Sequence, residues 1–335
     1  MKIAVVGAGS IGGYLGARLA AIGEDVTFIA RGPNLAAIQQ NGMRLRLEDG
    51  TEIHAKDVRA FEKMAEAGKQ DYVLLTLKAH QVGGVAADIA QHMCHDSTTI
   101  VTMQNGIPWW YFHKLGGPLE GTKLRTADPD GRIAQHLDPD RVIGSVVYPA
   151  ANLVSPGVVE VLEGNRFGLG ELDGSTTPRL KTIADTLIKA GFRVPIARDI
   201  RSEIWLKLWG NTSLNPLSAL THATLVDMCR YPLTRKLIAA MMAEAEAVAN
   251  AVGVHFKISI EKRIAGAEAV GAHKTSMLQD VELGRPLELE ALVGSVVELG
   301  ELVKVPTPNI SAIYASVNLL AETLNKQHAK LRITN

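Results

Sequence analysis

Cysteine is scarce in this chain of 335 residues, which contains only Cys94 and Cys229. Two thiols in a chain of this length provide no disulfide framework. The first apolar strand is expected to begin at Lys2, which leaves no room for a secretory signal ahead of it. We therefore expect a cytoplasmic protein that folds without disulfide bonds.

Neither sign of charge is in excess, because 35 basic residues balance 35 acidic ones. With no concentrated run of Lys and Arg, the sequence lacks the electrostatic signature of nucleic-acid binding. Long apolar runs are also missing, because residues 237–253 are interrupted by Glu244 and Glu246, which favours a buried or amphipathic helix over a membrane span. A small-molecule partner is favoured, with no role for nucleic acid or a membrane.

A metal-binding pattern is absent as well. His92, Cys94 and His95 lie close together in the sequence. Their spacing does not direct three ligands from one face of a helix, and no second cluster completes the set. We therefore expect no metal site.

What the sequence does contain begins with a glycine-rich turn. Residues 2–31 form the pattern of an apolar strand, a turn with the sequence GAGSIGG, an amphipathic helix and a second apolar strand. This order is the signature of a dinucleotide-binding unit, in which glycines let the backbone approach the pyrophosphate and the helix N-terminus binds it. The residues predicted to contact the cofactor here are Gly7, Ala8, Gly9, Ser10, Ile11 and Gly12.

The end of the second strand indicates which dinucleotide is bound. NAD sites place Asp or Glu there, about twenty residues after the glycines, to hold the ribose 2′-hydroxyl. In this sequence the strand ends in Ala30 and Arg31, and a guanidinium suits a 2′-phosphate. Arg31 could instead be an ordinary surface arginine, but that interpretation leaves the missing carboxylate unexplained. NADP(H) is therefore favoured.

Two further apolar strands, within residues 71–77 and 98–103, are followed by polar residues. In an open parallel sheet the ligand crevice lies beyond the carboxyl ends of the strands, so Lys78 and Asn105 are expected to face the cofactor. Asn105 could present its amide to the nicotinamide or to the substrate. The alternative for Asn105 and Gly106 is a simple turn, because this dipeptide is favoured in turns.

The chain is long enough for two domains, and its hydrophobic content of 47% provides a core for each. Residues 114–141 are expected to form a long polar loop, followed by strands at 142–150 and 158–164, a helix at 177–191 and a last short strand at 192–197. Beyond Asp199 nearly every segment has helical periodicity. The predicted organisation is an α/β Rossmann domain over residues 1–198 and an all-α domain over residues 199–335.

One predicted helix carries polar residues into an apolar segment. Lys207, Asn211 and Asn215 recur every four residues, and each such step advances only about 40° around a helix, so they form one narrow polar stripe. Burial of a lysine ammonium lowers its pKa towards the range useful for acid catalysis. Alternatively, Lys207 extends to water along an apolar stem, and Pro216 kinks or ends the helix so that Asn215 satisfies the freed carbonyls.

Two more polar residues, Ser276 and Glu288, lie on either side of a break at residues 284–286. Ser276 could hold a substrate carboxylate and Glu288 a hydroxyl group. From the sequence alone a simpler interpretation is favoured, in which Ser276 caps a short helix and Glu288 is a first-turn acid stabilised by the helix dipole.

Together these motifs resemble the ketopantoate reductase (2-dehydropantoate 2-reductase) family over essentially the whole chain. The resemblance rests on GAGSIGG, Arg31, TLK at Lys78, QNG at Asn105, WLKLWGNTSLNPL, and SMLQD followed by LELE. Its most specific parts are the polar stripe and the spacing from Ser276 to Glu288. It implies a Rossmann domain, a helical domain related to that of 6-phosphogluconate dehydrogenase, and NADPH-dependent reduction of a 2-oxo acid, ketopantoate, in pantothenate biosynthesis.

The resemblance also implies roles for individual residues. Lys207 would protonate the C2 carbonyl oxygen as hydride arrives, Asn105 would assist at the cofactor and the carbonyl, and Glu288 would take the C4 hydroxyl or orient Lys207. The substrate would be held by Asn211, Asn215 and Ser276. NADPH would be held by the glycine turn, Arg31 and Lys78.

Two departures from the family pattern leave the substrate open. Four consecutive aromatic residues, Trp109 to Phe112, follow the QNG motif, and the loop at residues 114–141 is longer than family members need. The aromatic residues could reshape the mouth of the site, or pack at a domain or subunit contact. One alternative function is reduction of a different 2-oxo or 3-hydroxy acid, and a second is a non-catalytic NADP-binding sensor module. A homodimer is compatible with apolar helices at the surface of the second domain.

Overall fold

The computed structural model describes the backbone of residues 1–333 and the side chains of residues 1–327. The chain forms two compact units. The first contains Met1–Gln104, Trp109–Lys123 and Asp128–Glu203, and the second contains Asn105–Pro108, Leu124–Ala127 and the described residues from Ile204 onward. Two short segments of the amino-terminal half therefore group with the second unit, a feature that the predicted division after residue 198 did not include.

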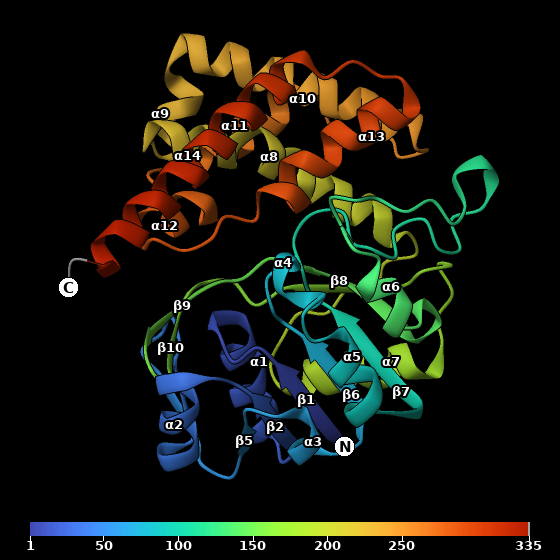
Figure 1. Cartoon of the computed structure of the whole chain (residues 1–335), viewed down its shortest axis with the longest axis vertical. Coiled ribbons are helices and arrows are strands. Elements are labelled where there is room, and N and C mark those ends of the chain that lie inside the picture. The colour runs from blue at the N-terminus through green and yellow to red at the C-terminus, as the bar shows by residue number, and fades with distance from the viewer. Residues whose placement is uncertain (334–335) are drawn as a thin grey trace. The chain divides into compact units, whose positions relative to one another are not determined.

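The first unit is built around a seven-stranded sheet with the order β11-β8-β7-β6-β1-β2-β5 (Figure 1). Neighbouring strands are parallel except for β11, which is antiparallel to β8. The strands are β1 (Lys2–Val6), β2 (Asp25–Ile29), β5 (Arg59–Phe61), β6 (Gln70–Leu75), β7 (Cys94–Thr102), β8 (Val142–Val147) and β11 (Phe167–Glu171).

Apolar clusters cover both faces of this sheet, because successive side chains of a strand point to opposite faces. Ile3 and Val5 of β1 belong to one cluster with α1 (Ser10–Ala21) and α7 (Pro178–Lys189). Ala4 and Val6 belong to the other cluster. The helical segments of that second cluster are α3 (Met64–Ala67), α4 (Ala79–Val82), α5 (Ala86–Asp88), η1 (Ile89–Met93) and α6 (Arg132–His136). The predicted Rossmann domain is confirmed.

A second sheet, of four strands in the order β4-β3-β10-β9, packs against α1. Its strands are β3 (Met43–Arg46), β4 (Glu52–Ala55), β9 (Ala150–Ser155) and β10 (Val158–Glu163), and α2 (Gly32–Asn41) precedes it in the chain. Strand β3 alternates between buried and exposed residues, as a strand with one packed face does. The sequence analysis predicted neither β3 nor β4, because strands of four residues are too short to establish a periodicity.

The strand predictions between residues 142 and 197 are confirmed only in part. The strand predicted at residues 142–150 is present as β8, but it ends at Val147, and β9 begins at Ala150. Strand β11, whose sequence FGLGE contains two glycines, was not predicted. Residues 192–197 form two isolated β-bridges with residues 166 and 169 in place of a strand, because Pro195 lacks the N–H group that a ladder needs.

The predicted polar loop at residues 114–141 contains three short helices, η2 (Gly117–Leu119), α6 (Arg132–His136) and η3 (Pro139–Arg141). Asp128 stabilises the start of α6, because its carboxylate accepts hydrogen bonds from the N–H groups of Ile133 and Ala134 at 3.1 and 2.9 Å. Ile133 and Leu137 are buried in the second apolar cluster. The predicted long polar loop is therefore interrupted by three short helices and is partly buried.

The secondary-structure elements of the second unit are all helices within its described residues, which confirms the predicted all-α domain. Its helical segments are α8 (Ile200–Thr221), α9 (Leu225–Arg230), α10 (Pro232–Ala251), α11 (Ile260–Ala269), α12 (Ser276–Glu282), η4 (Glu290–Gly294), α13 (Ser295–Val303) and α14 (Pro308–Ile333). Helix α8 continues through Pro216, so the alternative in which this proline ends the helix is wrong. None of the described helices is both long and apolar enough to cross a membrane.

The aromatic run at residues 109–112 belongs mainly to the core of the first unit. Trp110, Tyr111 and Phe112 are each at most 2% exposed. The indole Nε1 of Trp110 donates a hydrogen bond to Thr102 Oγ1 at 2.9 Å. Core packing accounts for these three residues, and a role in reshaping the mouth of a site does not.

Arg201 holds the backbone around this run. The residue is 7% exposed, and its guanidinium donates to the carbonyl oxygens of Tyr111, Leu172 and His113 at 2.7, 2.6 and 2.5 Å. Burial lowers the pKa of Arg201. The three carbonyl oxygens replace the water that the buried guanidinium has lost.

Replacement of Arg201 by Met should destabilise the protein, because three carbonyl oxygens lose their donor. At about 1–3 kcal/mol for each buried group left unsatisfied, we expect the free energy of unfolding to fall by about 3 kcal/mol or more. Urea unfolding would measure this loss. The exposed Arg198 provides a matched control, and Arg198→Met should change the stability by less than about 0.5 kcal/mol. Equal effects of the two substitutions would contradict the assignment.

Candidate functional site

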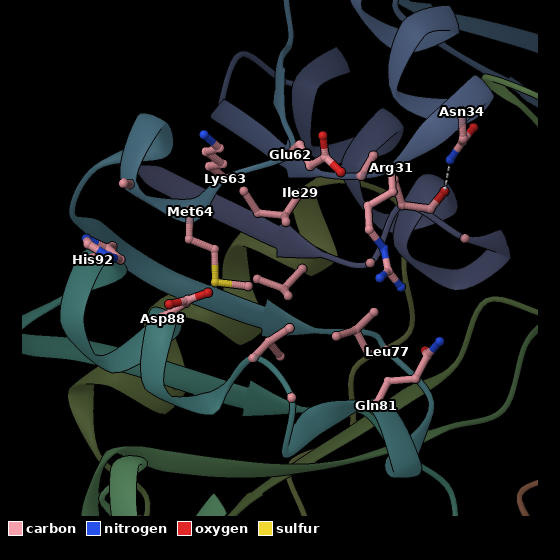
Figure 2. A pocket seen from close by; sticks show the side chains of 18 of the residues that line it. Ile29, Arg31, Asn34, Glu62, Lys63, Met64, Leu77, Gln81, Asp88 and His92 are labelled. Carbon is pink, nitrogen blue, oxygen red and sulfur yellow. Dashed lines mark hydrogen bonds between the residues drawn. The ribbon is translucent and has the colours of Figure 1, made fainter.

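A cavity of about 650 Å³ lies at the carboxyl ends of β1, β2 and β6 in the first unit (Figure 2). It is lined by the turn at residues 7–9, by residues 29–31 and by Leu77 and Gln81, with Glu62 and Asp88 among the other lining residues. Small-molecule sites are typically about 300–1,000 Å³ in volume. The position is where an open parallel sheet binds its ligand.

The glycine turn brings β1 and α1 into close contact. A Cβ atom on Gly12 would lie 2.0 Å from the carbonyl oxygen of Gly7, so no larger residue fits. Helix α1 begins at Ser10 without a side-chain cap, which leaves its first N–H groups available to an anion. A Cβ atom on Gly9 would meet no atom within 4 Å. This open space before an uncapped helix fits the pyrophosphate of a dinucleotide.

Arg31 directly precedes α2, and its side chain points into the cavity in Figure 2. The residue is exposed, and within the described part of the chain its guanidinium has no hydrogen-bond or ion-pair partner. Ala30 lines the cavity beside it, in the region where an NAD site places a carboxylate. The charge and position of Arg31 fit a 2′-phosphate.

Asn34 is a residue of this site that the sequence analysis missed. Its Nδ2 donates to the carbonyl oxygen of Ala8 at 2.6 Å, and its Oδ1 accepts from the N–H of Gly157 at 2.8 Å. The first of these bonds is visible in Figure 2. Asn34 therefore ties the glycine turn to the turn between β9 and β10. Its place after Pro33 in the first turn of α2 was the available signal, but no local pattern revealed its distant partner.

The other residues predicted to bind the cofactor do not line the cavity. Lys78 is the residue before α4, where its N–H donates to the side chain of Gln81 at 3.1 Å. Gln81 itself lines the cavity. Ser10, Ile11 and Gly12 lie in the first turn of α1, outside the cavity lining.

In the second unit the structure brings Lys207 and Asn105 together. Lys207 Nζ donates a hydrogen bond to Asn105 Oδ1 at 2.7 Å. Burial of the ammonium lowers the pKa of Lys207 to about 8, and the nearby carboxylate of Glu288 acts in the opposite direction and raises it. The lysine side chain keeps some exposure overall, so the enclosed part is its charged end. Lys207, Asn105 and Glu288 therefore form one electrostatic group.

The remaining predicted residues occupy the neighbouring elements. Asn215 is 5% exposed, and its Nδ2 makes a long contact of 3.5 Å with the hydroxyl oxygen of Ser276. The cap of α12 is Thr275, whose side chain accepts from the N–H of Leu278, so the interpretation of Ser276 as the cap is wrong. Asn211 is partly buried, and its side chain makes no hydrogen bond within the described residues.

Within the described side chains, no group of three His, Cys, Asp or Glu residues is arranged to hold a metal ion.

Comparisons with known proteins bear on the family of the chain. Residues 3–113 match the family described as ketopantoate reductase PanE/ApbA, and residues 199–321 match ketopantoate reductase PanE/ApbA C terminal. A 2-dehydropantoate 2-reductase from Mesorhizobium japonicum is 54% identical over 322 residues, which cover 96% of this chain and 98% of that protein.

Solved structures give the same result. The protein in a crystal structure from Ralstonia solanacearum shares 44% sequence identity with this chain, and the two structures align with a TM-score of 0.92. The match covers 97% of this chain and 98% of that chain. A 2-dehydropantoate 2-reductase from Methylococcus capsulatus is 27% identical with a TM-score of 0.80, again over 97% and 98%. The resemblance seen in the motifs is confirmed, and the chain belongs to the ketopantoate reductase family, whose members are NADPH-dependent oxidoreductases acting on CH–OH groups.

Proposed function

We propose that this protein reduces ketopantoate to pantoate with NADPH, with Lys207 as the general acid, and that it acts in pantothenate biosynthesis. The observation that supports this most directly is the 2.7 Å hydrogen bond from Lys207 Nζ to Asn105 Oδ1, in surroundings that lower the pKa of Lys207 to about 8. Such a lysine is still mostly protonated at neutral pH, yet it is a stronger acid than a lysine in water.

The reaction determines what Lys207 must do. Bound NADPH supplies a hydride, which adds to C2 of the 2-oxo acid. Negative charge develops on the former carbonyl oxygen as C2 becomes tetrahedral, so a cationic donor beside that oxygen stabilises the transition state more than the substrate. Transfer of a proton from Nζ then completes the hydroxyl group. A lysine suits this step because one atom supplies both the charge and the proton.

Asn105 and Glu288 control the orientation and charge of that lysine. Because Asn105 Oδ1 accepts one Nζ hydrogen at 2.7 Å, the ammonium of Lys207 is oriented by a fixed acceptor. The carboxylate of Glu288 favours the charged form and limits the fall in the pKa of Lys207. Glu288 is also a candidate acceptor for the C4 hydroxyl of ketopantoate.

Three polar residues near this group are proposed to position the substrate. The hydroxyl of Ser276 is exposed and can donate to the substrate carboxylate. Asn215, which contacts Ser276, and Asn211, four residues earlier on α8, would complete the substrate contacts. In the first unit, the glycine turn and Arg31 would hold the pyrophosphate and the 2′-phosphate of NADPH, with Lys78 as a further cofactor contact.

A homodimer stays a prediction. A ketopantoate reductase from Staphylococcus aureus, which shares the fold at 18% identity, is described as dimeric. Exposed apolar side chains of the second unit, such as Tyr231 and Leu233, support the same arrangement in this protein.

Replacement of Lys207 by Ala should lower kcat for ketopantoate reduction by about a hundredfold or more, because general acid catalysis contributes on that scale. The affinity for NADPH, measured by fluorescence titration, should be unchanged. Turnover within a few-fold of the unmodified protein would rule out the assignment.

The same assay, applied to a panel of 2-oxo acids, tests the substrate. A kcat/KM for ketopantoate far below that of another acid would favour the alternative reductase. Binding of NADPH without turnover of any oxo acid would favour the non-catalytic sensor.

The pH dependence should follow the charge of Lys207. Because only the ammonium form donates a proton, kcat/KM for reduction should fall as pH rises through about 8. Oxidation of pantoate should increase over the same interval, because the neutral amine is then the base. Glu288→Gln removes the charge that raises the pKa of Lys207, so it should move the descending limb to lower pH. A descending limb near pH 10 in the unmodified protein, where an ordinary lysine titrates, would contradict the lowered pKa of Lys207, and the absence of any descending limb up to about pH 10 would contradict a lysine acid.

Arg31→Ala should weaken NADPH binding by about 10- to 100-fold, because one charge-assisted contact to the 2′-phosphate contributes about 1.5–3 kcal/mol. NADH lacks this phosphate, so its affinity should change little. Fluorescence titration with both cofactors measures the difference. Arg44→Ala, at an exposed position of β3 outside the cavity, is the matched control. Equal losses for NADPH and NADH would contradict the role of Arg31.

A further inference from the structure

A π-helical turn follows Glu288 in the chain. Segment η4 (Glu290–Gly294) is π-helical and leads directly into α13. A π-turn places one extra residue in a helical turn, and such turns occur frequently at functional sites. Two backbone carbonyls of this turn, those of Ala291 and Leu292, accept hydrogen bonds from other parts of the second unit.

The hydrogen bond to the Leu292 carbonyl comes from α8, the helix that carries the polar stripe. Thr212 is fully buried, and its Oγ1 donates to the carbonyl oxygen of Leu292 at 2.6 Å. The N–H of Leu292 in turn donates to the carbonyl oxygen of Glu288 at 3.3 Å. Two hydrogen bonds therefore connect the backbone of Glu288 to the helix that carries Lys207.

The second connection leads to Asn105. The N–H of Ile107 donates to the carbonyl oxygen of Ala291 at 3.1 Å, and Ser295 Oγ donates to the same oxygen at 2.7 Å. Gly106 has a φ of +87°, and a Cβ atom there would lie 2.0 Å from the Ala291 oxygen. The backbone beside Asn105 is therefore in direct contact with the π-turn.

We propose that Thr212 is a positioning residue for the reaction, because it fixes the π-turn that holds Glu288 and Asn105 in place around Lys207. This inference rests on the proposed role of Lys207 as the general acid. Thr212 does not touch the reacting atoms. It acts through Leu292, and Ser295 supports the same turn through Ala291.

The pH profile should report a loss of this positioning. Among the described residues, Glu288 is the one charged group that shifts the pKa of Lys207. The other carboxylates on neighbouring elements, Asp280 on α12, Glu290 on η4 and Glu298 on α13, do not contribute to that shift. If the π-turn loosens, the Glu288 carboxylate moves from its place, and the descending limb that reports Lys207 moves to lower pH because burial continues to disfavour the ammonium.

The test compares Thr212→Val, which keeps the shape of the side chain without its hydroxyl, with Thr212→Ser, which keeps the hydroxyl. We expect Thr212→Val to lower kcat for ketopantoate by about tenfold, the equivalent of one hydrogen bond of about 1.4 kcal/mol, and to shift the descending limb to lower pH. Thr212→Ser should restore both values. Ser295→Ala should shift the limb in the same direction, which provides a second variant if Thr212→Val folds poorly.

Ser213→Ala is the matched control. Ser213 is fully buried on the same helix, but its Oγ donates to the carbonyl oxygen of Trp209 within α8 and not to the π-turn. This variant should keep the kcat and the pH profile of the unmodified protein. An unchanged profile in both Thr212→Val and Ser295→Ala, or an equal loss in Ser213→Ala, would overturn the proposal.

Hydrogen–deuterium exchange of residues 288–296 provides a readout that needs no substrate. Exchange should be faster in Thr212→Val than in Thr212→Ser or Ser213→Ala, and equal rates in all three would overturn the structural link. If the unmodified protein fails to reduce ketopantoate, the proposed function fails, and the exchange result still decides whether Thr212 holds the turn.

Discussion

A lysine ammonium enclosed by protein requires replacements for the water that it has lost, and the second unit is organised around that requirement. Asn105 supplies an oxygen acceptor and Glu288 supplies an opposing charge. The partners come from distant parts of the chain, since Asn105 is 102 positions from Lys207. This demand accounts for why Asn105–Pro108 groups with the helical unit although strands of the first unit precede and follow it.

The first unit solves a different electrostatic problem. The chain has no net charge at neutral pH, so it has no overall field to attract a phosphorylated cofactor. At the proposed cofactor site, recognition would then depend on short-range groups, namely an uncapped helix start and the side-chain cations of Arg31 and Lys63. Glu62 and Asp88 also line the cavity, so the cation at Arg31 acts in mixed surroundings and its position matters more than the total charge.

The features that could be predicted from the sequence are those with a fixed local spacing. The glycine turn, the strand that ends at Arg31 and the four-residue repeat of the polar stripe are all of this kind. The sheet formed by β3, β4, β9 and β10 was mostly missed because its strands are short and two of them pair across more than one hundred residues. Asn34 and Thr212 were missed for a related reason, because their partners lie 123 and 80 positions away. Pro216 is a case in which the local signal is overridden. A proline was expected to kink or end the helix in one alternative, but it is tolerated here because residues 212–219 are all buried by tertiary packing.

Because Glu290–Gly294 form a π-turn, the number of residues in this segment affects its contacts as much as the identity of those residues. Its contacts with Ile107 and Thr212 use backbone carbonyls, so exchange of its outward side chains leaves those acceptors where they are. Removal of one residue would instead restore α-helical spacing and rotate one side of the turn by about 100° relative to the other. Insertion or deletion of one residue in this stretch would therefore disturb the arrangement more directly than replacement of one of its outward side chains.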